Sequence, residues 1–415
     1  MFVTSGSSTE SEVRDGGPVG DGSVPLVIAT ILGREGSTGV WTHVQQLQRY
    51  CAKRGIATTL VTPFSWKRPL TVPVFGFRFL IERLSRSASV AWHRQWHGVF
   101  LRNALRQSLA EVGACSIYAQ CPVAAQAALS ARTGPHQRVV MAVHFRVSQA
   151  DEWVNKGELK RGGAVFRAIR QLERELIPRV DGLVYVSKWA QQALDSWLPE
   201  VAAVPSTVVG NFVEPAEPEP TQQKAGDLVT VGVLEPVKNH RYTLEVLAAA
   251  NRAGRTLTLD VFGDGPLRKD LLHLAQELGV ADQVRFYGYR PDVRDFLPGY
   301  RAYVHASYSE SSSLAIIEAM AAGLPIVAAR IGAIPEICDE GVEARFWPLD
   351  DAATGAATLI ELLDSEPARL QAAAAASARF RREFDASLVA PQLLAFLTGS
   401  PAPVYQGAAS INAGW

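Results

Sequence analysis

The sequence predicts an α/β protein built from two doubly wound domains of similar size that face each other across a cleft. Short apolar runs rich in β-formers alternate with longer helical patterns, which indicates stacked βαβ units and parallel sheets. The alternation stops once, at a proline-rich segment, and then begins again. A length of 415 residues also fits two cores better than one.

The first half of the chain carries the first set of alternating elements. Residues 1–24 are rich in glycine, serine and acidic side chains, so we expect a disordered lead-in and no signal peptide. An N-terminal domain over residues 25–212 follows, with a helix at Val40–Lys53. Its strands are expected at Leu26–Leu32, Ile56–Thr62, Ser116–Ala119, Val139–His144 and Gly182–Ser187.

A linker over residues 213–226 holds three prolines and no apolar periodicity. The C-terminal domain over residues 227–385 should contain strands at Leu228–Val233, Leu257–Phe262, Val284–Tyr287, Ala302–Ala306 and Pro325–Ala328. A last helical stretch, Arg379–Leu397, either packs on this domain or crosses back to the first through residues 386–399. Residues 400–415 read as a loose tail.

The composition excludes several classes of protein. The 41 basic and 41 acidic side chains give a formal charge of zero, so no global field attracts nucleic acid or a membrane. The four cysteines are scattered without a C-x-x-C pair, which argues against a zinc knuckle or a disulfide framework and suits a reducing cytoplasm. No apolar run approaches the ~20 residues of a membrane-spanning helix. We therefore expect a cytoplasmic protein.

The most informative segment covers residues 307–325, where a predicted strand ends, a polar loop follows and a helix begins. Serines are good N-caps, so the helix should start at Ser312 or Ser313, with Leu314 in its first turn. The N-terminus of a helix exposes unpaired N–H groups and carries about half a positive charge. This loop can therefore present donors to diphosphate or sugar oxygens.

Two glutamates flank that helix start. Glu310 lies in the loop, where it can accept from sugar hydroxyls, and Glu318 lies inside the helix, where it can bind the vicinal hydroxyls of a ribose. By spacing alone, two glutamates eight residues apart are more often solvated surface residues. The strand ahead and the Glu-Ala-Met-Ala-x-Gly-x-Pro run behind favour the functional interpretation. With these neighbours the segment resembles the E-x7-E motif of glycosyltransferase family 4.

A second segment, Thr230–His240, is similar to the strand and loop that supply a diphosphate-binding lysine in that family, here Lys238. A lysine ammonium can neutralise a departing diphosphate. Without its neighbours, a surface lysine after a turn would be an equally good interpretation. Val233 departs from the pattern, because the family usually has an arginine there. Lys238, Arg241 and Arg330 are the candidates to supply the positive charge that Val233 lacks.

Further motifs match the family in order along the chain. Gly263 and Gly265 permit close backbone approach at a strand end, and the turn that carries Tyr289 and Arg290 is where the family usually places the nucleobase. Tight turns also need glycine, so each motif alone is weak. Near the N-terminus, Gly36 and Gly39 resemble the family's glycine loop, and their G-x-x-G-x-x-G spacing is not a nicotinamide fingerprint.

His144 ends a predicted strand and matches a histidine that the family often places against the donor sugar. The alternative is an ordinary, satisfied histidine at a strand end. The resemblance assigns Glu310, Lys238 and His144 to catalysis. It assigns the remaining positions to donor binding, namely Gly36, Gly39, Gly263, Gly265, Tyr289, Arg290, Ser312, Ser313, Leu314 and Glu318.

The resemblance implies a GT-B fold and a retaining glycosyltransferase that takes a hexose-type sugar from a nucleotide donor such as a UDP- or GDP-sugar. The acceptor would be a glycan or a lipid-linked sugar, in bacterial polysaccharide or glycolipid assembly. The sequence has no D-x-D and no His/Asp/Glu cluster with ligand spacing, so we expect no metal and no cofactor. Two alternatives stay open, a non-hydrolysing nucleotide-sugar epimerase and a catalytically weakened nucleotide-sugar-binding protein.

Residues 66–106 stand apart because eight basic residues face one acidic residue, Glu82, a net charge of +7. Seven aromatic residues are interleaved with them. This mixture suits an anionic membrane surface, where each basic residue contributes ~1 kcal/mol. It would place the enzyme on the inner face of the plasma membrane. A solvated pair of basic helices with aromatics in the core is an equal alternative, and no nucleic-acid-binding motif accompanies the segment.

Overall fold

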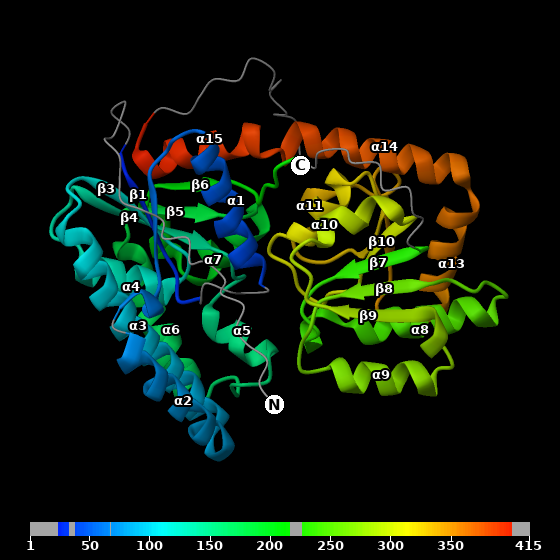
Figure 1. Cartoon of the computed structure of the whole chain (residues 1–415), viewed down its shortest axis with the longest axis horizontal. Coiled ribbons are helices and arrows are strands. Elements are labelled where there is room, and N and C mark those ends of the chain that lie inside the picture. The colour runs from blue at the N-terminus through cyan, green and yellow to red at the C-terminus, as the bar shows by residue number, and fades with distance from the viewer. Residues whose placement is uncertain (1–23, 33–37, 67, 216–225, 401–415) are drawn as a thin grey trace, which may run out of the picture.

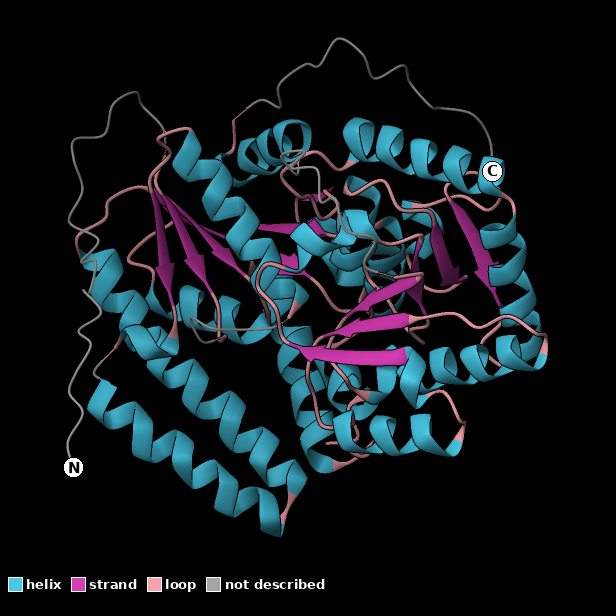
Figure 2. Cartoon of the chain, turned by 45° about the vertical axis from the view of Figure 1, so that its right-hand side comes forward, coloured by secondary structure: helices cyan, strands magenta, loops and turns pink. Residues whose placement is uncertain are grey.

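The computed structural model describes residues 24–32, 38–66, 68–215 and 226–400. Two parallel sheets of six strands each lie side by side, one in each half of the chain (Figure 1). Helices cover both faces of each sheet (Figure 2). The predicted fold class, two facing doubly wound domains, is therefore confirmed.

The N-terminal sheet has the order β2-β1-β3-β4-β5-β6. Its strands are β1 (Leu26–Ala29), β2 (Thr58–Val61), β3 (Cys115–Ala119), β4 (Gln137–Val143), β5 (Gly182–Tyr185) and β6 (Ser206–Val208). The helices between them are α1 (Gly39–Lys53), α2 (Arg68–Leu84), α3 (Arg86–Ala110), α4 (Pro122–Ala131), α5 (Gln149–Asn155), α6 (Ala164–Leu176) and α7 (Lys188–Trp197).

The C-terminal sheet has the order β12-β11-β10-β7-β8-β9. Its strands are β7 (Leu228–Val231), β8 (Leu259–Phe262), β9 (Val284–Gly288), β10 (Ala302–His305), β11 (Ile326–Ala329) and β12 (Ala344–Trp347). Its helices are α8 (His240–Arg252), α9 (Arg268–Glu277), α10 (Val293–Phe296), α11 (Leu314–Ala321), α12 (Ile334–Ile337), α13 (Ala352–Asp364) and α14 (Glu366–Glu383).

All ten predicted strands are present, but several were predicted too long. β1, for example, ends at Ala29, three residues before the predicted Leu32, because the polar loop begins at Thr30. The edge strands β6 and β12 were not predicted. β6 has three residues, and the middle residues of β12 are half-exposed, so neither shows the continuous apolar run of a buried parallel strand.

The predicted single helix Arg379–Leu397 is wrong, because the structure has two helices there. α14 ends at Glu383, and Asp385 caps a new helix, α15 (Ala386–Thr398), by accepting from the N–H of Ser387 at 2.7 Å. Leu393 and Leu397 of α15 are fully buried in the core of the N-terminal domain. The end of the chain therefore crosses back onto the first domain (Figure 1).

Each sheet reverses its strand order at one point, between β1 and β3 and between β7 and β10. Open α/β sheets bind ligands beyond the carboxyl ends of the strands at such a reversal. The loops that follow β7 and β10 are therefore the expected position of a site in the C-terminal domain. No helix in the described ranges is long and apolar enough to span a membrane.

Candidate active site

The loops after β7 and β10 carry the two central residues predicted from sequence. β10 ends at His305, and the following loop holds Glu310 before α11 begins at Leu314. Ser313 caps α11 by accepting from the N–H of Ile316 at 3.4 Å, as the sequence predicted. The N–H of Tyr308 donates to the carbonyl of Val237 at 2.8 Å, which ties this loop to the one after β7.

The two loops place Lys238 and Glu310 in direct contact. Lys238 Nζ donates to Glu310 Oε1 at 2.6 Å, and His305 Nε2 lies 2.8 Å from the same oxygen. Tyr303 in turn contacts the other ring nitrogen of His305 at 3.3 Å. Lys238 uses one of its three donors in this way, so two remain for a ligand. His305 was not predicted, although its place five residues before Glu310 could have drawn attention to it.

The electrostatics of this cluster keep Glu310 ionised. Burial by itself would raise the pKa of its carboxyl, but the charge of Lys238 and the bonds from His305 and Lys238 hold that pKa well below its usual range. Three buried polar atoms nearby in sequence have no hydrogen-bond partner among the described residues, namely Asn239 Nδ2, His240 Nδ1 and Ser307 Oγ. An unmet buried donor costs about 1–3 kcal/mol, so these atoms favour a bound polar ligand.

Glycines shape the loops as the sequence predicted, and one more glycine takes part. Gly263 has φ 137°, and a Cβ there would overlap the carbonyl of Gly232. A Cβ on Gly265 would lie 2.6 Å from the carbonyl oxygen of Leu234. Gly332 has φ 55° and packs directly on the main chain of Glu310. Only glycine fits such approaches, so Gly332 helps to hold Glu310 in place.

A cavity of about 150 Å³ lies between the two domains and contains Glu318. Tyr289, Arg290 and Gly263 also line it, so four of the predicted donor-binding residues converge there. Burial raises the pKa of Glu318 to about 7, against the lowering effect of the nearby Arg294 and Arg49. Gly265 does not line this cavity and serves the shape of the loop.

Val233 lines the same cavity. The arginines around it differ from Arg241 and Arg330, the candidates from the sequence. Arg241 pairs with Glu245 on the exposed side of α8, and Arg330 is exposed and lies over the ring of Phe346. The arginines that line the cavity, besides Arg290, are Arg49 from α1 and Arg294 from α10. Sequence reasoning missed them because α1 reaches this cavity only through the packing of one domain on the other.

The N-terminal wall of the cleft is built around two histidines. His43 Nδ1 lies 3.0 Å from Asn211 Oδ1 and Nε2 lies 3.2 Å from the hydroxyl of Tyr118, which fixes a neutral tautomer. Burial lowers the pKa of His43 to about 4. His144 lies against His43 and pairs through Nε2 with Gln120 Oε1 at 3.0 Å.

Burial, with the neighbouring His43, also holds the pKa of His144 well below its usual value. With Gln120 and Thr38, His144 lines a cavity of about 260 Å³ on this wall. The structure thus places His144 on the N-terminal wall, separate from the contact between Lys238 and Glu310. Its ring is uncharged at neutral pH.

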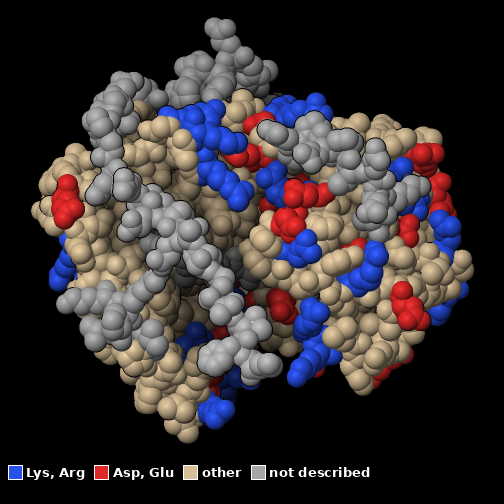
Figure 3. All heavy atoms as spheres, viewed as in Figure 1, with Lys and Arg blue, Asp and Glu red and all other residues tan. Residues whose placement is uncertain are grey.

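The two walls meet at the helix starts. Gly39 opens α1 and lies against Leu314, the first residue of α11, while Asn211 donates to the carbonyl of Ser312 at 3.1 Å. Gly36 lies outside the described residues. A further cavity, of about 460 Å³, lies between α5 and the loop residues Val237 and Ser309, which are the neighbours of Lys238 and Glu310. Basic and acidic side chains both border the hollow between the two halves (Figure 3).

No group of three or more His, Cys, Asp or Glu side chains in the described ranges is arranged to hold a metal ion. The cysteines Cys51, Cys115, Cys121 and Cys338 are free and buried.

The basic aromatic segment folds into the hairpin of α2 and α3, which projects from the N-terminal domain (Figure 2). Four of its aromatic residues, Phe75, Trp92, Trp96 and Phe100, contact one another's rings. Arg94 is buried, Arg78 pairs with Glu158, and Lys67 lies outside the described residues. Large apolar side chains are nevertheless exposed at the tip, with Phe79 72% and Leu84 89% accessible.

Two facing doubly wound domains, with paired loops at the strand reversal and a cleft between them, define the GT-B class of glycosyltransferases. Residues 37–217 match the family described as Glycosyltransferase Family 4, and residues 214–379 match Glycosyl transferases group 1. The chain belongs to glycosyltransferase family 4.

Curated relatives match only part of the chain. The D-inositol 3-phosphate glycosyltransferase of Mycolicibacterium smegmatis is 36% identical over 161 residues, which cover 38% of this chain and 36% of that protein. The GtfA subunit of the UDP-N-acetylglucosamine–peptide N-acetylglucosaminyltransferase of Streptococcus gordonii is 29% identical over 129 residues, covering 31% of this chain and 24% of that one. The match thus spans about a third or less of the length of each relative.

Solved structures share the fold over nearly the whole chain. HepE from Anabaena, in complex with UDP and glucose, has a TM-score of 0.66 at 17% identity and covers 90% of this chain and 100% of that one. Sucrose-phosphate synthase from Thermosynechococcus elongatus has a TM-score of 0.69 at 15% identity, covering 89% and 97%. At such identities the likeness establishes the fold alone.

Proposed function

We propose that this protein is a retaining glycosyltransferase that moves a hexose-type sugar from a UDP- or GDP-sugar to a glycan or lipid-linked acceptor. The observation that carries the proposal is the contact between Lys238 and Glu310 at the strand reversal of the C-terminal sheet, with the N-terminus of α11 beside it. A fixed cation, a helix start and an ionised acid at one point suit a sugar attached to a diphosphate. Bacterial polysaccharide or glycolipid assembly is the context we propose.

On the donor side, Lys238 would neutralise the charge that develops on the leaving diphosphate. The N–H groups at the start of α11 would add hydrogen bonds to its oxygens. Glu318, inside the same helix and lining the cavity between the domains, would accept from the ribose hydroxyls. Arg49 and Arg294, which line that cavity, would supply the positive charge that Val233 does not.

At the sugar, the bond from its anomeric carbon to the diphosphate oxygen breaks while a bond to the acceptor oxygen forms on the same face. The proton of the acceptor hydroxyl passes to the leaving phosphate. Glu310, held ionised by Lys238 and His305, would orient the sugar by accepting from its hydroxyls. His144, a neutral ring on the opposite wall, would contact the donor sugar from the acceptor side.

We propose that the reaction needs no metal ion, because a lysine and backbone N–H groups stabilise the leaving group in its place. Turnover with a nucleotide sugar should be unchanged after treatment with EDTA and gel filtration. A loss that Mg²⁺ or Mn²⁺ restores would contradict metal independence and would leave the assigned roles of Lys238 and Glu310 intact.

The donor can be identified by thermal shift with UDP, GDP, ADP and their sugars. A ligand at 100 times its dissociation constant stabilises a protein by about 2.7 kcal/mol, so one nucleotide should raise the melting temperature well above the others. Incubation of the stabilising nucleotide sugar with protein alone then separates the alternatives. An epimerase would convert it to a new sugar without acceptor, whereas a transferase would leave it as it is or hydrolyse it slowly.

We further propose that the tip of the α2–α3 hairpin docks on an anionic membrane surface. Phe79, Leu80 and Leu84 are more than half exposed there, next to the exposed Arg83 and Arg86. Apolar side chains at the headgroup level with arginines beside them fit an anionic bilayer. This position would bring the cleft to a lipid-linked acceptor.

Flotation with liposomes tests this docking. Wild-type protein should float with vesicles that contain anionic lipid and remain behind with neutral vesicles. Leu84→Glu should abolish flotation, whereas Leu370→Glu, at another exposed leucine, on α14, should not. Equal flotation of the wild type with both kinds of vesicle, or with neither, would contradict the proposal.

A further inference from the structure

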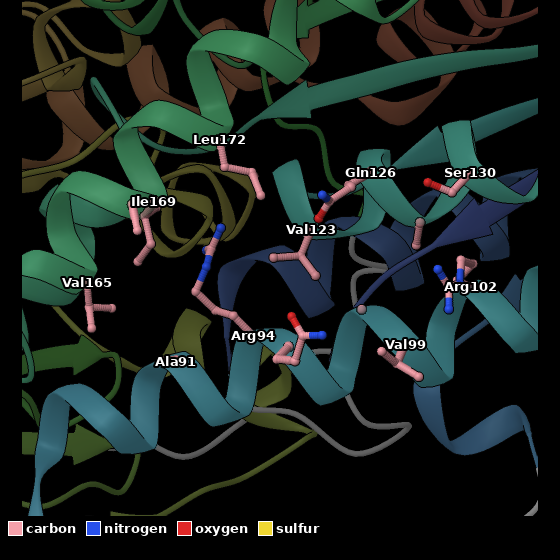
Figure 4. A pocket seen from close by; sticks show the side chains of 14 residues that line it. Ala91, Arg94, Val99, Arg102, Val123, Gln126, Ser130, Val165, Ile169 and Leu172 are labelled. Atoms are coloured by element: carbon pink, nitrogen blue, oxygen red, sulfur yellow. The ribbon is translucent and has the colours of Figure 1, made fainter.

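A separate cavity lies outside the cleft, on the outer side of the N-terminal domain between α3, α4 and α6 (Figure 4). Its volume of about 320 Å³ is at the lower end of the range for small-molecule sites. None of its described lining residues lines the cleft cavities. We call it the back cavity.

The lining of the back cavity is positive. Arg94 and Arg102 both rise from α3 into it, and Gln95, Gln126 and Ser130 add polar groups (Figure 4). The described lining residues include no acid. Arg94 and Arg102 are eight residues apart, which is about 12 Å at about 1.5 Å per residue, so the cavity has a cation near each end.

Between the arginines the walls are apolar. Val99 of α3, Val123 of α4 and Ile169 and Leu172 of α6 face the space from three sides (Figure 4). A cavity with apolar walls and a few convergent polar groups is the usual form of a ligand site, and its polar groups fix the orientation of the ligand.

Arg94 and Arg102 differ in how many of their N–H groups have an acceptor within the protein. Arg94 is 9% exposed, donates to the side-chain amide oxygen of Gln149 and lies near Glu173. Arg102 has a buried Nε without a hydrogen-bond partner among the described residues. Three other arginines in the described ranges also leave a buried Nε unpaired, but each of them pairs with a carboxylate through another nitrogen, which Arg102 does not. An oxyanion in the cavity would supply the acceptor that Arg102 lacks.

We propose that the back cavity binds a small anionic amphiphile, in which a phosphate or carboxylate group pairs with Arg102 and an apolar body lies along Val99, Val123 and Ile169. Arginine presents a planar fork that matches both oxyanions. Gln126 and Ser130, on the neighbouring helix α4, give the oxyanion further donors. The proposal does not depend on transferase activity.

Isothermal titration calorimetry with hexyl phosphate and hexanoate tests the proposal, with inorganic phosphate and 1-hexanol as the two halves of the ligand. We expect hexyl phosphate or hexanoate to bind at least tenfold more tightly than either half. Arg102→Gln should weaken that binding at least tenfold. Arg106→Gln should not, because Arg106 lies on the same helix, is exposed and does not line the cavity.

Two further variants separate the back cavity from the cleft. Ala168→Trp fills the cavity from an exposed position on α6 and should block binding while the melting temperature stays near that of the wild type. Lys238→Ala should leave the binding of hexyl phosphate unchanged. Binding that survives both Arg102→Gln and Ala168→Trp, or that disappears in Lys238→Ala, would overturn the proposal, as would a failure of both amphiphiles to bind.

Discussion

The two walls of the cleft handle charge in opposite ways. On the C-terminal wall, Lys238 and His305 contact the same oxygen of Glu310 at 2.6 and 2.8 Å, and these contacts hold the pKa of Glu310 well below its usual range. On the N-terminal wall, His43 and His144 are buried with neutral amide and hydroxyl partners, and their pKa values are lowered. One wall therefore holds fixed charges, and the other presents uncharged polar groups.

This difference matches the two halves of a nucleotide sugar. A diphosphate needs a cation, which Lys238 supplies beside Glu310. Sugar hydroxyls need neutral donors and acceptors, because an ionised group without a partner would be costly to bury. We infer that the C-terminal wall determines the rate of diphosphate departure and that the N-terminal wall determines how the sugar and the acceptor are oriented.

Substitutions at Lys238 and Glu310 should have the largest effect. Loss of one fixed group that stabilises developing charge typically lowers kcat by about 10²–10³. We expect Lys238→Ala and Glu310→Gln each to reduce turnover of the nucleotide sugar by that factor, in steady-state assays of released nucleoside diphosphate. The melting temperature should stay within a few degrees of the wild type.

The double variant Lys238→Ala/Glu310→Gln sharpens this prediction. Because the two side chains share a contact of 2.6 Å, their effects should be non-additive, and the double variant should lose less than the product of the single losses. Unchanged turnover in either single variant would refute the roles assigned here.

His144 should matter less, because it contributes one neutral contact. A neutral hydrogen bond is worth about 0.5–1.5 kcal/mol, so His144→Gln should reduce kcat/KM roughly two- to tenfold. The exposed His136 provides a matched control, and His136→Gln should have no effect. A drop of 10³-fold in His144→Gln would mean that the N-terminal wall takes part in bond cleavage and would break the comparison.

Arg49 is the charged exception on the N-terminal wall, since it belongs to α1 and lines the cavity with Glu318. If it compensates for Val233, Arg49→Gln should weaken binding of the nucleoside diphosphate roughly two- to fivefold by calorimetry, within the range for exposed charge pairs. Arg241→Gln, on the exposed side of α8, is the control. Equal affinities in both variants would mean that Arg49 does not replace the arginine that the family has at the position of Val233.

Glu318 gives a smaller effect on stability that depends on pH. Its folded-state pKa is raised by burial from 4.5 to about 7, so the carboxyl is neutral in both states below pH 4.5 and costs stability increasingly as pH rises through 7. Without nucleotide, Glu318→Gln should therefore melt at a higher temperature than the wild type at pH 8, by an amount that reflects roughly 1–3 kcal/mol. At pH 4.5 the variant and the wild type should melt at the same temperature. The same difference at both pH values would contradict this account of Glu318.

The fold and the C-terminal wall could be predicted from sequence because both depend on local patterns. Short runs rich in β-formers marked the ten predicted strands, and the serines before Leu314 marked the start of α11. Lys238 and Glu310 each lie in a loop that directly follows a predicted strand, β7 or β10, so the strand ends alone bring them to the same edge of the sheet. The helix break before α15 was not predicted, because Asp385 fits a helical pattern as a polar residue. The break depends on a β-bridge between Asp385 and the distant Val213.

The rest of the site could not be predicted, because it depends on contacts between distant segments. His43 and Asn211 are 168 residues apart in the chain, and Asn211 and Ser312 are 101 apart. Arg49 reaches the cavity of Glu318 only when α1 packs near α10 and α11. No local spacing encodes such pairs, so on the N-terminal wall only His144 and the glycine loop of Gly36 and Gly39 were predicted, and these through resemblance.

The most direct test of the central claim is a crystal structure of the protein with the nucleoside diphosphate that stabilises it most. We expect the terminal phosphate to lie within hydrogen-bond distance of Lys238 Nζ and of the N–H groups at the start of α11, with the ribose at Glu318. A diphosphate bound elsewhere, with Lys238 still paired only with Glu310, would contradict the assignment of this cleft.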